Sequence, residues 1–136
     1  MDWLLPLHSL VRYLVVLASV ISLVWFALVM AKRITGSESR DRMLMSIFSG
    51  LIDLQVLIGI VLLLAQASTQ GWLQFRIEHA VTMIIAAVVA HLPMRWRKSD
   101  LPREVKARNN LVVIVAVIVI VLLGIARLPG NRWQIG

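Results

Sequence analysis

Four long apolar runs constrain the fold of this chain more than any other feature. They cover residues 4–31, 43–66, 77–94 and 111–127. Each run approaches or exceeds the roughly 17 to 25 residues that a helix needs to cross a hydrocarbon core. The segments between them, "KRITGSESRDR", "ASTQGW" and "RWRKSDLPREVKARNN", are too hydrophilic to stay in lipid. The sequence therefore predicts an all-α integral membrane protein whose four transmembrane helices form a single domain over residues 1–136.

The composition favours a lipid bilayer as the surroundings of this chain. Hydrophobic residues make up 60% of it, charged residues only 15%, and the mean hydropathy is +0.85, which is too apolar for an ordinary soluble domain. A formal charge of +7 would suggest nucleic acid in a soluble protein. Here the basic residues gather in short loops beside the apolar runs, so we expect them to set topology and expect no nucleic acid partner. The chain has no cysteine, which excludes disulfides, thiolate metal sites and covalent c-type haem.

The basic residues are distributed unequally between the two sides of the predicted membrane protein. The positive-inside rule places the more basic loops in the cytoplasm, so both termini are expected outside it. Short connections make consecutive helices antiparallel neighbours, which predicts an up-and-down four-helix bundle with the helices at 4–31 and 77–94 on a diagonal. The first and third loops hold Lys32, Arg33, Arg40, Arg42, Arg95, Arg97, Lys98, Arg103, Lys106 and Arg108, and the opposite side holds Arg76, Arg127 and Arg132.

Several polar side chains lie within the apolar runs. A charged side chain near a bilayer centre costs about 2.5 to 3.5 kcal/mol on insertion scales, so such residues usually face the bundle interior and carry a task. With a rise of about 1.5 Å per residue, His8 is expected roughly 14 Å outward of the centre, and Arg12, Glu78 and His79 roughly 8 to 11 Å outward. These four residues would share one outer layer. Three others follow at greater depth, Asp53 and Gln55 near the middle and His91 in the inner half.

The outer layer suits a flat cofactor held between two histidines. If neighbouring helices pack about 8 to 10 Å apart, the diagonal of a square bundle is about 11 to 14 Å. One haem b is the natural candidate, with neutral His8 and His79 as its axial metal ligands. Arg12 and Glu78 would neutralise one another, and Glu78 could also orient an imidazole. Cations for the haem propionates would come from the outer rim, at Arg76, Arg127 and Arg132.

Structural interpretations of the same residues stay open. An intramembrane histidine often only joins two helices by a hydrogen bond, and this applies to His8 and His79 and, most of all, to His91. A second set at helical spacing in the run 43–66 would form either a small-residue packing seam with one buried acid or a path for protons or ions. That set is Ser46, Ser49, Gly50 and Asp53.

The chain resembles a group of small bacterial four-helix membrane proteins labelled cytochrome b-like. The resemblance is carried by "LHSLVRY", "DLQVLIG", "RIEHAVTMIIAAVVAH" and a Leu-Pro after the last apolar run, and it covers most of the chain. It implies haem and electron transfer in the bacterial cytoplasmic (inner) membrane. Asp53 stands where a histidine is expected two residues before Gln55, so at most one bis-histidine haem is available. The specific residues are His8, Arg12, Gln55, Gly59, Glu78, His79 and His91.

Our first hypothesis is therefore a membrane haem protein that relays single electrons near the outer face, for a quinol or a redox partner protein. It would be an electron carrier or redox subunit rather than a stand-alone enzyme. The alternative is a cofactor-free accessory or assembly subunit of a larger membrane complex, in which buried polar residues serve assembly. A third hypothesis is a proton- or ion-conducting bundle that uses Asp53 and Glu78. The length of 136 residues and the lack of a Gly/Pro signal for a broken helix within a span argue against this hypothesis unless the protein forms a homo-oligomer.

Overall fold

The computed structural model describes residues 3–126, and the regular secondary structure in this range is entirely helical. The elements are α1 (Leu4–Met30), α2 (Ser39–Gln70), α3 (Gln74–Ala90), the short 3₁₀ helix η1 (Leu92–Arg95) and α4 (Arg103–Ala126). Four spans are long and apolar enough to cross a membrane, the third of them running on through η1 to Arg95. By helix length and hydropathy, the chain is the multi-pass, all-α membrane protein that the four apolar runs predict.

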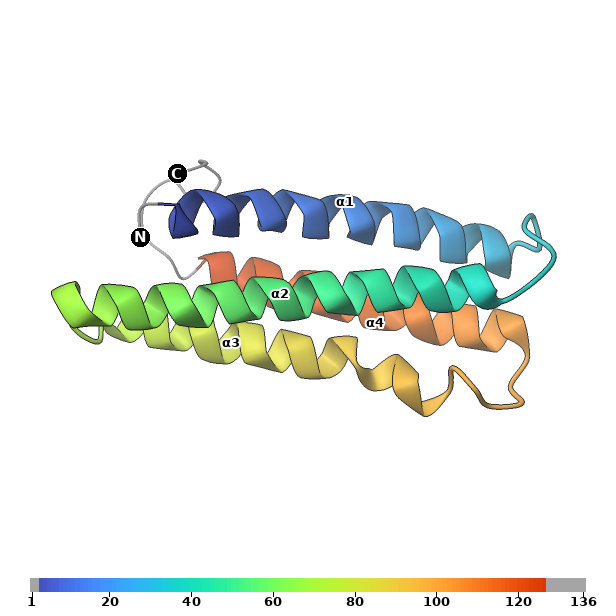
Figure 1. The fold of residues 1–136 in the computed structure, drawn as a ribbon. Helices are drawn as coiled ribbons and strands as arrows, with labels where there is room; N and C mark the ends of the chain where they lie inside the picture. Colours follow the sequence, from blue (N-terminus) through green and yellow to red (C-terminus); the bar gives the residue numbers. More distant parts are fainter. Residues whose placement is uncertain (1–2, 127–136) are drawn as a thin grey trace.

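The four long helices form an up-and-down bundle (Figure 1). α1 packs against α2 and α4, and α3 packs against the same two helices, so α1 and α3 face each other across the diagonal. The loops 31–38 and 96–102 lie at one end, which we call the basic end. At the other end, the terminal end, α1 begins and α4 ends. This arrangement agrees with the one expected from short connections between antiparallel neighbours.

Two helices are longer than the apolar runs that predicted them. α2 begins at Ser39 rather than at residue 43 and continues to Gln70 rather than 66, and α4 begins at Arg103 rather than at residue 111. Hydropathy marks only the part of a helix that lipid would surround, whereas backbone hydrogen bonding continues into polar sequence. Segments that looked like loop, "SRDR" and "REVKARNN", are therefore the first turns of helices at the basic end.

Two sequence signals place the ends of α2 and α3. Gly71 follows α2 with a φ of +79°, a conformation that L side chains rarely adopt, and the chain there turns back into α3. α3 ends at Ala90 rather than at residue 94, because Pro93 lacks a donor N–H and disfavours the α conformation of the residue before it. His91 consequently caps α3, at the point where the chain tightens into η1.

The bundle is apolar inside and outside. Phe26, Phe48 and Ile114 are fully buried between the helices and fill the core. Large apolar side chains also cover the outer surface, for example Leu57 and Val88, each about three-fifths exposed. Helices that are hydrophobic all round suit a membrane interior, where the outer side chains contact lipid instead of water.

Candidate functional site

His8 and His79 lie together in the terminal half of the bundle. They come from the diagonal helices α1 and α3, and the two rings are close enough for an electrostatic interaction. Both side chains are partly buried. Each ring also contacts a further helix, α2 for His8 and α4 for His79, and their pairing as two ligands of one metal stays a prediction.

The ring of His79 is oriented by the backbone of α4. Its Nδ1 lies 3.2 Å from the carbonyl oxygen of Gly124, and because a carbonyl can only accept, Nδ1 carries the proton and donates it. In a neutral imidazole, Nε2 then keeps its lone pair. Gly124 has no side chain to hold α3 away: a Cβ there would come within 2.5 Å of Met83 Cε and 3.1 Å of Thr82 Cγ2.

The ring of His8 lies against α2. Its Nδ1 is 3.5 Å from the side-chain nitrogen of Gln55, while Gln55 Oε1 is buried and has no hydrogen-bond partner among the described residues. Rotating this amide by 180° lets Oε1 accept a hydrogen bond from His8 Nδ1, which satisfies the buried oxygen and leaves the lone pair on Nε2. The Nε2 atom faces Gly59, where a Cβ would lie only 3.1 Å away.

The contact between His8 and Gln55 corrects the depths expected from the sequence. Those depths put His8 roughly 14 Å outward of the layer that holds Gln55, taking each apolar run as centred in the bilayer. The two side chains touch, so this layering is wrong. The reason is that α2 extends well beyond the start of α1 at the terminal end (Figure 1), so the midpoints of the helices are not level.

Arg12 and Glu78 lie close in sequence to the two histidines. Arg12 follows His8 by one helical turn, and its guanidinium carbon lies 5.3 Å from the centroid of the Tyr13 ring. Glu78 precedes His79, and its Oε1 accepts a hydrogen bond of 3.1 Å from Gln74. The mutual neutralisation of Arg12 and Glu78 stays a prediction.

The outer-rim arginines are described only in part. Arg76 lies in the first turn of α3 and donates a hydrogen bond of 2.6 Å to Gln70 Oε1 at the end of α2. It therefore stands at the terminal end, on the same side of the bundle as the two histidines. Arg127 and Arg132 lie outside the described residues.

A second polar contact joins His91 to Asp53. His91 Nε2 lies 2.8 and 2.9 Å from the two carboxylate oxygens, and the side chains are 41% and 48% exposed. For His91, the hydrogen bond between helices is therefore what the structure shows. The packing seam with one buried acid is wrong, because Asp53 is exposed and a Cβ added at Gly50 would meet nothing within 4 Å.

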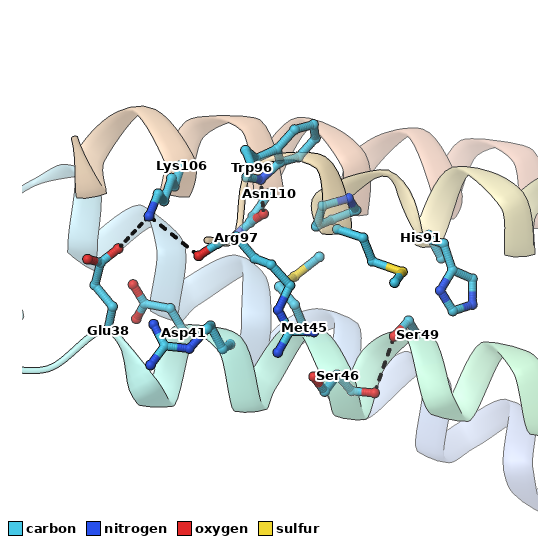
Figure 2. A pocket seen from close by; sticks show the side chains of 14 residues that line it. Glu38, Asp41, Met45, Ser46, Ser49, His91, Trp96, Arg97, Lys106 and Asn110 are labelled. Atoms are coloured by element: carbon cyan, nitrogen blue, oxygen red, sulfur yellow. Dashed lines mark hydrogen bonds and ion pairs between the residues drawn. The ribbon is translucent and has the colours of Figure 1, made fainter. Parts of the chain in front are cut away.

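His91 also lines a small cavity in the basic half of the bundle (Figure 2). Met45, Ser46 and Ser49 from α2 face His91 and Arg97 across it. Its volume of about 40 Å³ has room for water or a small ion but not for an organic cofactor. The same wall includes Trp96, whose ring nitrogen donates a hydrogen bond of 2.8 Å to Asn110 of α4.

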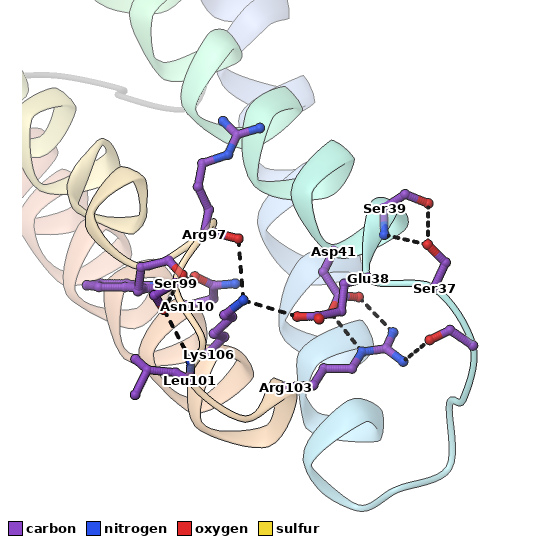
Figure 3. Close-up of polar contacts among 12 residues, drawn as sticks. Ser37, Glu38, Ser39, Asp41, Arg97, Ser99, Leu101, Arg103, Lys106 and Asn110 are labelled. Carbon is purple, nitrogen blue, oxygen red and sulfur yellow. Dashed lines mark hydrogen bonds and ion pairs between the residues drawn. The ribbon is translucent and has the colours of Figure 1, made fainter.

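A network of charges closes the basic end (Figure 3). The buried Asp41 of α2 accepts hydrogen bonds of 2.9 Å from Arg103 Nε and Nη2 and one of 2.8 Å from Trp25 Nε1. Arg103 also donates to the carbonyl of Gly36 at 3.1 Å. We call Trp25, Asp41 and Arg103 the inner clasp, because they tie α1, α2 and α4 together. Sequence reasoning missed it, since it treated Asp41 and Arg103 as loop residues.

Lys106 extends this network towards the cavity. Its ammonium lies 3.5 Å from Glu38 and 3.4 Å from the carbonyl of Arg97 (Figure 3). A lysine that the topology rule counts only as a loop charge is thus buried in the bundle and joins α4 to the segment after η1.

The chain matches no protein-family model, no curated protein and no solved structure. These comparisons identify no family.

Proposed function

We propose that the protein is a membrane b-type haem protein that relays single electrons near the terminal face of the bundle. The observation that carries this proposal is the pairing of His8 and His79 across the diagonal. Each imidazole comes from a different helix, and each is held through Nδ1 by a neighbour, Gln55 or Gly124. Two imidazoles whose Nε2 atoms keep their lone pairs are the donor set of a six-coordinate b-type haem.

Two glycines bring helix backbone close to the two rings. Gly59 and Gly124 lack side chains where a Cβ would crowd the histidines or the helix behind them. The core of the bundle is largely apolar, which suits a macrocycle, and Arg76 at the terminal end would supply a cation for a propionate. Arg127 is proposed for the same role from the sequence alone. When bound, the haem supplies a one-electron redox couple. His8 and His79 would hold it, and Gln55 and the Gly124 carbonyl would keep both rings in orientation.

The redox partner is proposed by chemistry only, as a quinol in the bilayer or a redox protein at the membrane surface. Either would exchange electrons with a centre near the terminal end. No part of this role requires the chain to transform a substrate, which favours an electron carrier or a redox subunit.

The absorption spectrum of the purified protein tests the proposal directly. Protein from haem-replete cells is expected to show the sharp reduced bands of low-spin, six-coordinate haem, at one haem per chain. A colourless protein would overturn the proposal and favour the cofactor-free accessory subunit.

We propose that the basic end faces the cytoplasm, because ten of the Lys and Arg residues lie in or beside its loops. The chain has no native cysteine, so single cysteines report position cleanly. Ser37→Cys and Ser99→Cys are expected to resist an impermeant thiol reagent in intact cells, whereas Ser68→Cys is expected to react. Permeabilised cells are the control, since all three cysteines should then be labelled. The opposite pattern in intact cells would reverse the orientation.

Gly59→Ala is expected to weaken haem retention roughly tenfold without removing a ligand, a typical cost of disturbing a residue behind a metal ligand. The added Cβ would lie 3.1 Å from His8 Nε2, the coordinating nitrogen. Gly50→Ala is the matched control on the same helix, because its Cβ would meet nothing within 4 Å. Haem transfer to apomyoglobin measures retention. Equal rates of haem loss from Gly59→Ala and Gly50→Ala would mean that the close approach of His8 to α2 does not contribute to haem binding.

A further inference from the structure

The contact between Asp53 and His91 has no part in the proposed haem site. Asp53 lies in the apolar middle of α2, and His91 lies on the third span. An ionised side chain at such depth is costly, by about 2.5 to 3.5 kcal/mol on insertion scales. Two ionisable side chains at this depth, each about half exposed, are therefore expected to have a function beyond packing.

The charge of the pair changes sharply with one proton. With a neutral imidazole and an ionised carboxylate, the pair carries a net charge of −1. One added proton on His91 makes an imidazolium that donates to the carboxylate, at 2.8 to 2.9 Å, and the net charge becomes zero. Proton uptake thus removes a net charge from an apolar region, and proton release restores it.

The cavity beside His91 links the pair to the basic end. Ser46 and Ser49 line it on the side of α2, and His91 lines it at its deep end (Figure 2). The charged groups that face it are Glu38 from the loop before α2, Asp41 and Arg42 from α2, Arg97 from the segment after η1, and Lys106 from α4.

The two acids among these groups already have cationic partners. Asp41 is paired with Arg103, and Glu38 with Lys106. The third acid, Asp53, is paired with His91 in the described residues 3–126. The cavity is large enough for water, which can carry a proton between its mouth and the imidazole.

We infer that Asp53 and His91 form a proton-binding site within the membrane-spanning region, loaded from the basic end through the cavity lined by Ser46 and Ser49. The inference goes beyond the proposed function and does not depend on haem. The site takes up one proton per chain and returns it by the same route.

The route is tested by cysteine labelling on α2. Ser49→Cys lines the cavity, whereas Ile47→Cys lies nearer the basic end but points outward, with 47% of Ile47 exposed on the apolar surface. A small water-soluble methanethiosulfonate reagent, added to purified protein in nanodiscs, is expected to modify Ser49→Cys at least tenfold faster. If only the depth of the residue in the bilayer set the rate, Ile47→Cys would be modified faster than Ser49→Cys. Equal or slower modification of Ser49→Cys would overturn the aqueous route.

The proton site itself is tested by nuclear magnetic resonance of the ¹⁵N-labelled histidine rings in nanodiscs. The chain has three histidines, so His91→Gln identifies the signals of His91 by their loss. These signals are expected to titrate with pH. Asp53→Asn is expected to change the pH dependence of these signals, because it removes the carboxylate that lies 2.8 to 2.9 Å from His91 Nε2. A His91 that does not titrate, or that titrates identically in Asp53→Asn, would overturn the inference.

Discussion

His8→Ala and His79→Ala are each expected to abolish the low-spin haem spectrum of the purified protein. A six-coordinate haem needs both imidazoles, and each variant removes one of them while leaving the other anchored through its Nδ1 contact. The remaining ligand would hold haem weakly, so we expect most of the cofactor to be lost during purification. Haem content per chain and the reduced-minus-oxidised spectrum measure the effect.

His91→Ala is the matched control for this experiment. His91 follows His79 by 12 residues, which corresponds to roughly 18 Å along a helix axis, too far for both to bind one iron. The absorption spectrum of His91→Ala is expected to equal that of the unchanged protein. Haem that survives in His8→Ala but is lost in His91→Ala would move the cofactor to the basic half and contradict the site proposed here.

Asp41→Leu is expected to lower the free energy of unfolding by about 3 kcal/mol, the cost of breaking a buried ion pair from one side. The side chains of Arg103 and Asp41 are only 15% and 10% exposed, so the variant leaves a largely buried guanidinium and the Trp25 N–H without their acceptor. Unfolding in mixed micelles, followed by circular dichroism as denaturing detergent is added, measures the change.

Asp100→Leu provides the comparison at the same end of the bundle. It removes an acid of the same charge from an exposed position, so we expect a change within about 0.5 kcal/mol. Equal destabilisation by the two variants would show that the inner clasp contributes no more than surface charge does.

The bundle could be predicted because hydropathy reports helices that lipid must surround. The four apolar runs and their short connections led to four antiparallel helices, and the diagonal placement of α1 and α3 followed from neighbour packing alone. The helix ends could not be obtained in this way. Polar turns such as Ser39–Arg42 are helical because of backbone hydrogen bonds, to which hydropathy is blind.

The contact of His8 with Gln55 and that of Asp41 with Arg103 depend on how the helices are shifted along the bundle axis. No local sequence pattern gives these shifts. Gln55 was placed at a different depth from His8 because each run was centred separately, whereas the long α2 shifts the layers. The partners Asp41 and Arg103 are 62 positions apart in the chain. Their spacing carries no signal, and both resemble ordinary topology-determining loop charges.

The inner clasp also determines how the basic end can open. At that end, a bidentate ion pair and a tryptophan hold three helices together. Because all three hydrogen bonds converge on Asp41, neither α1 nor α4 can leave α2 there without exposing a buried carboxylate that has lost a partner. Opening of the basic end is therefore expected to be a concerted event that involves α1, α2 and α4 together, rather than the fraying of one helix.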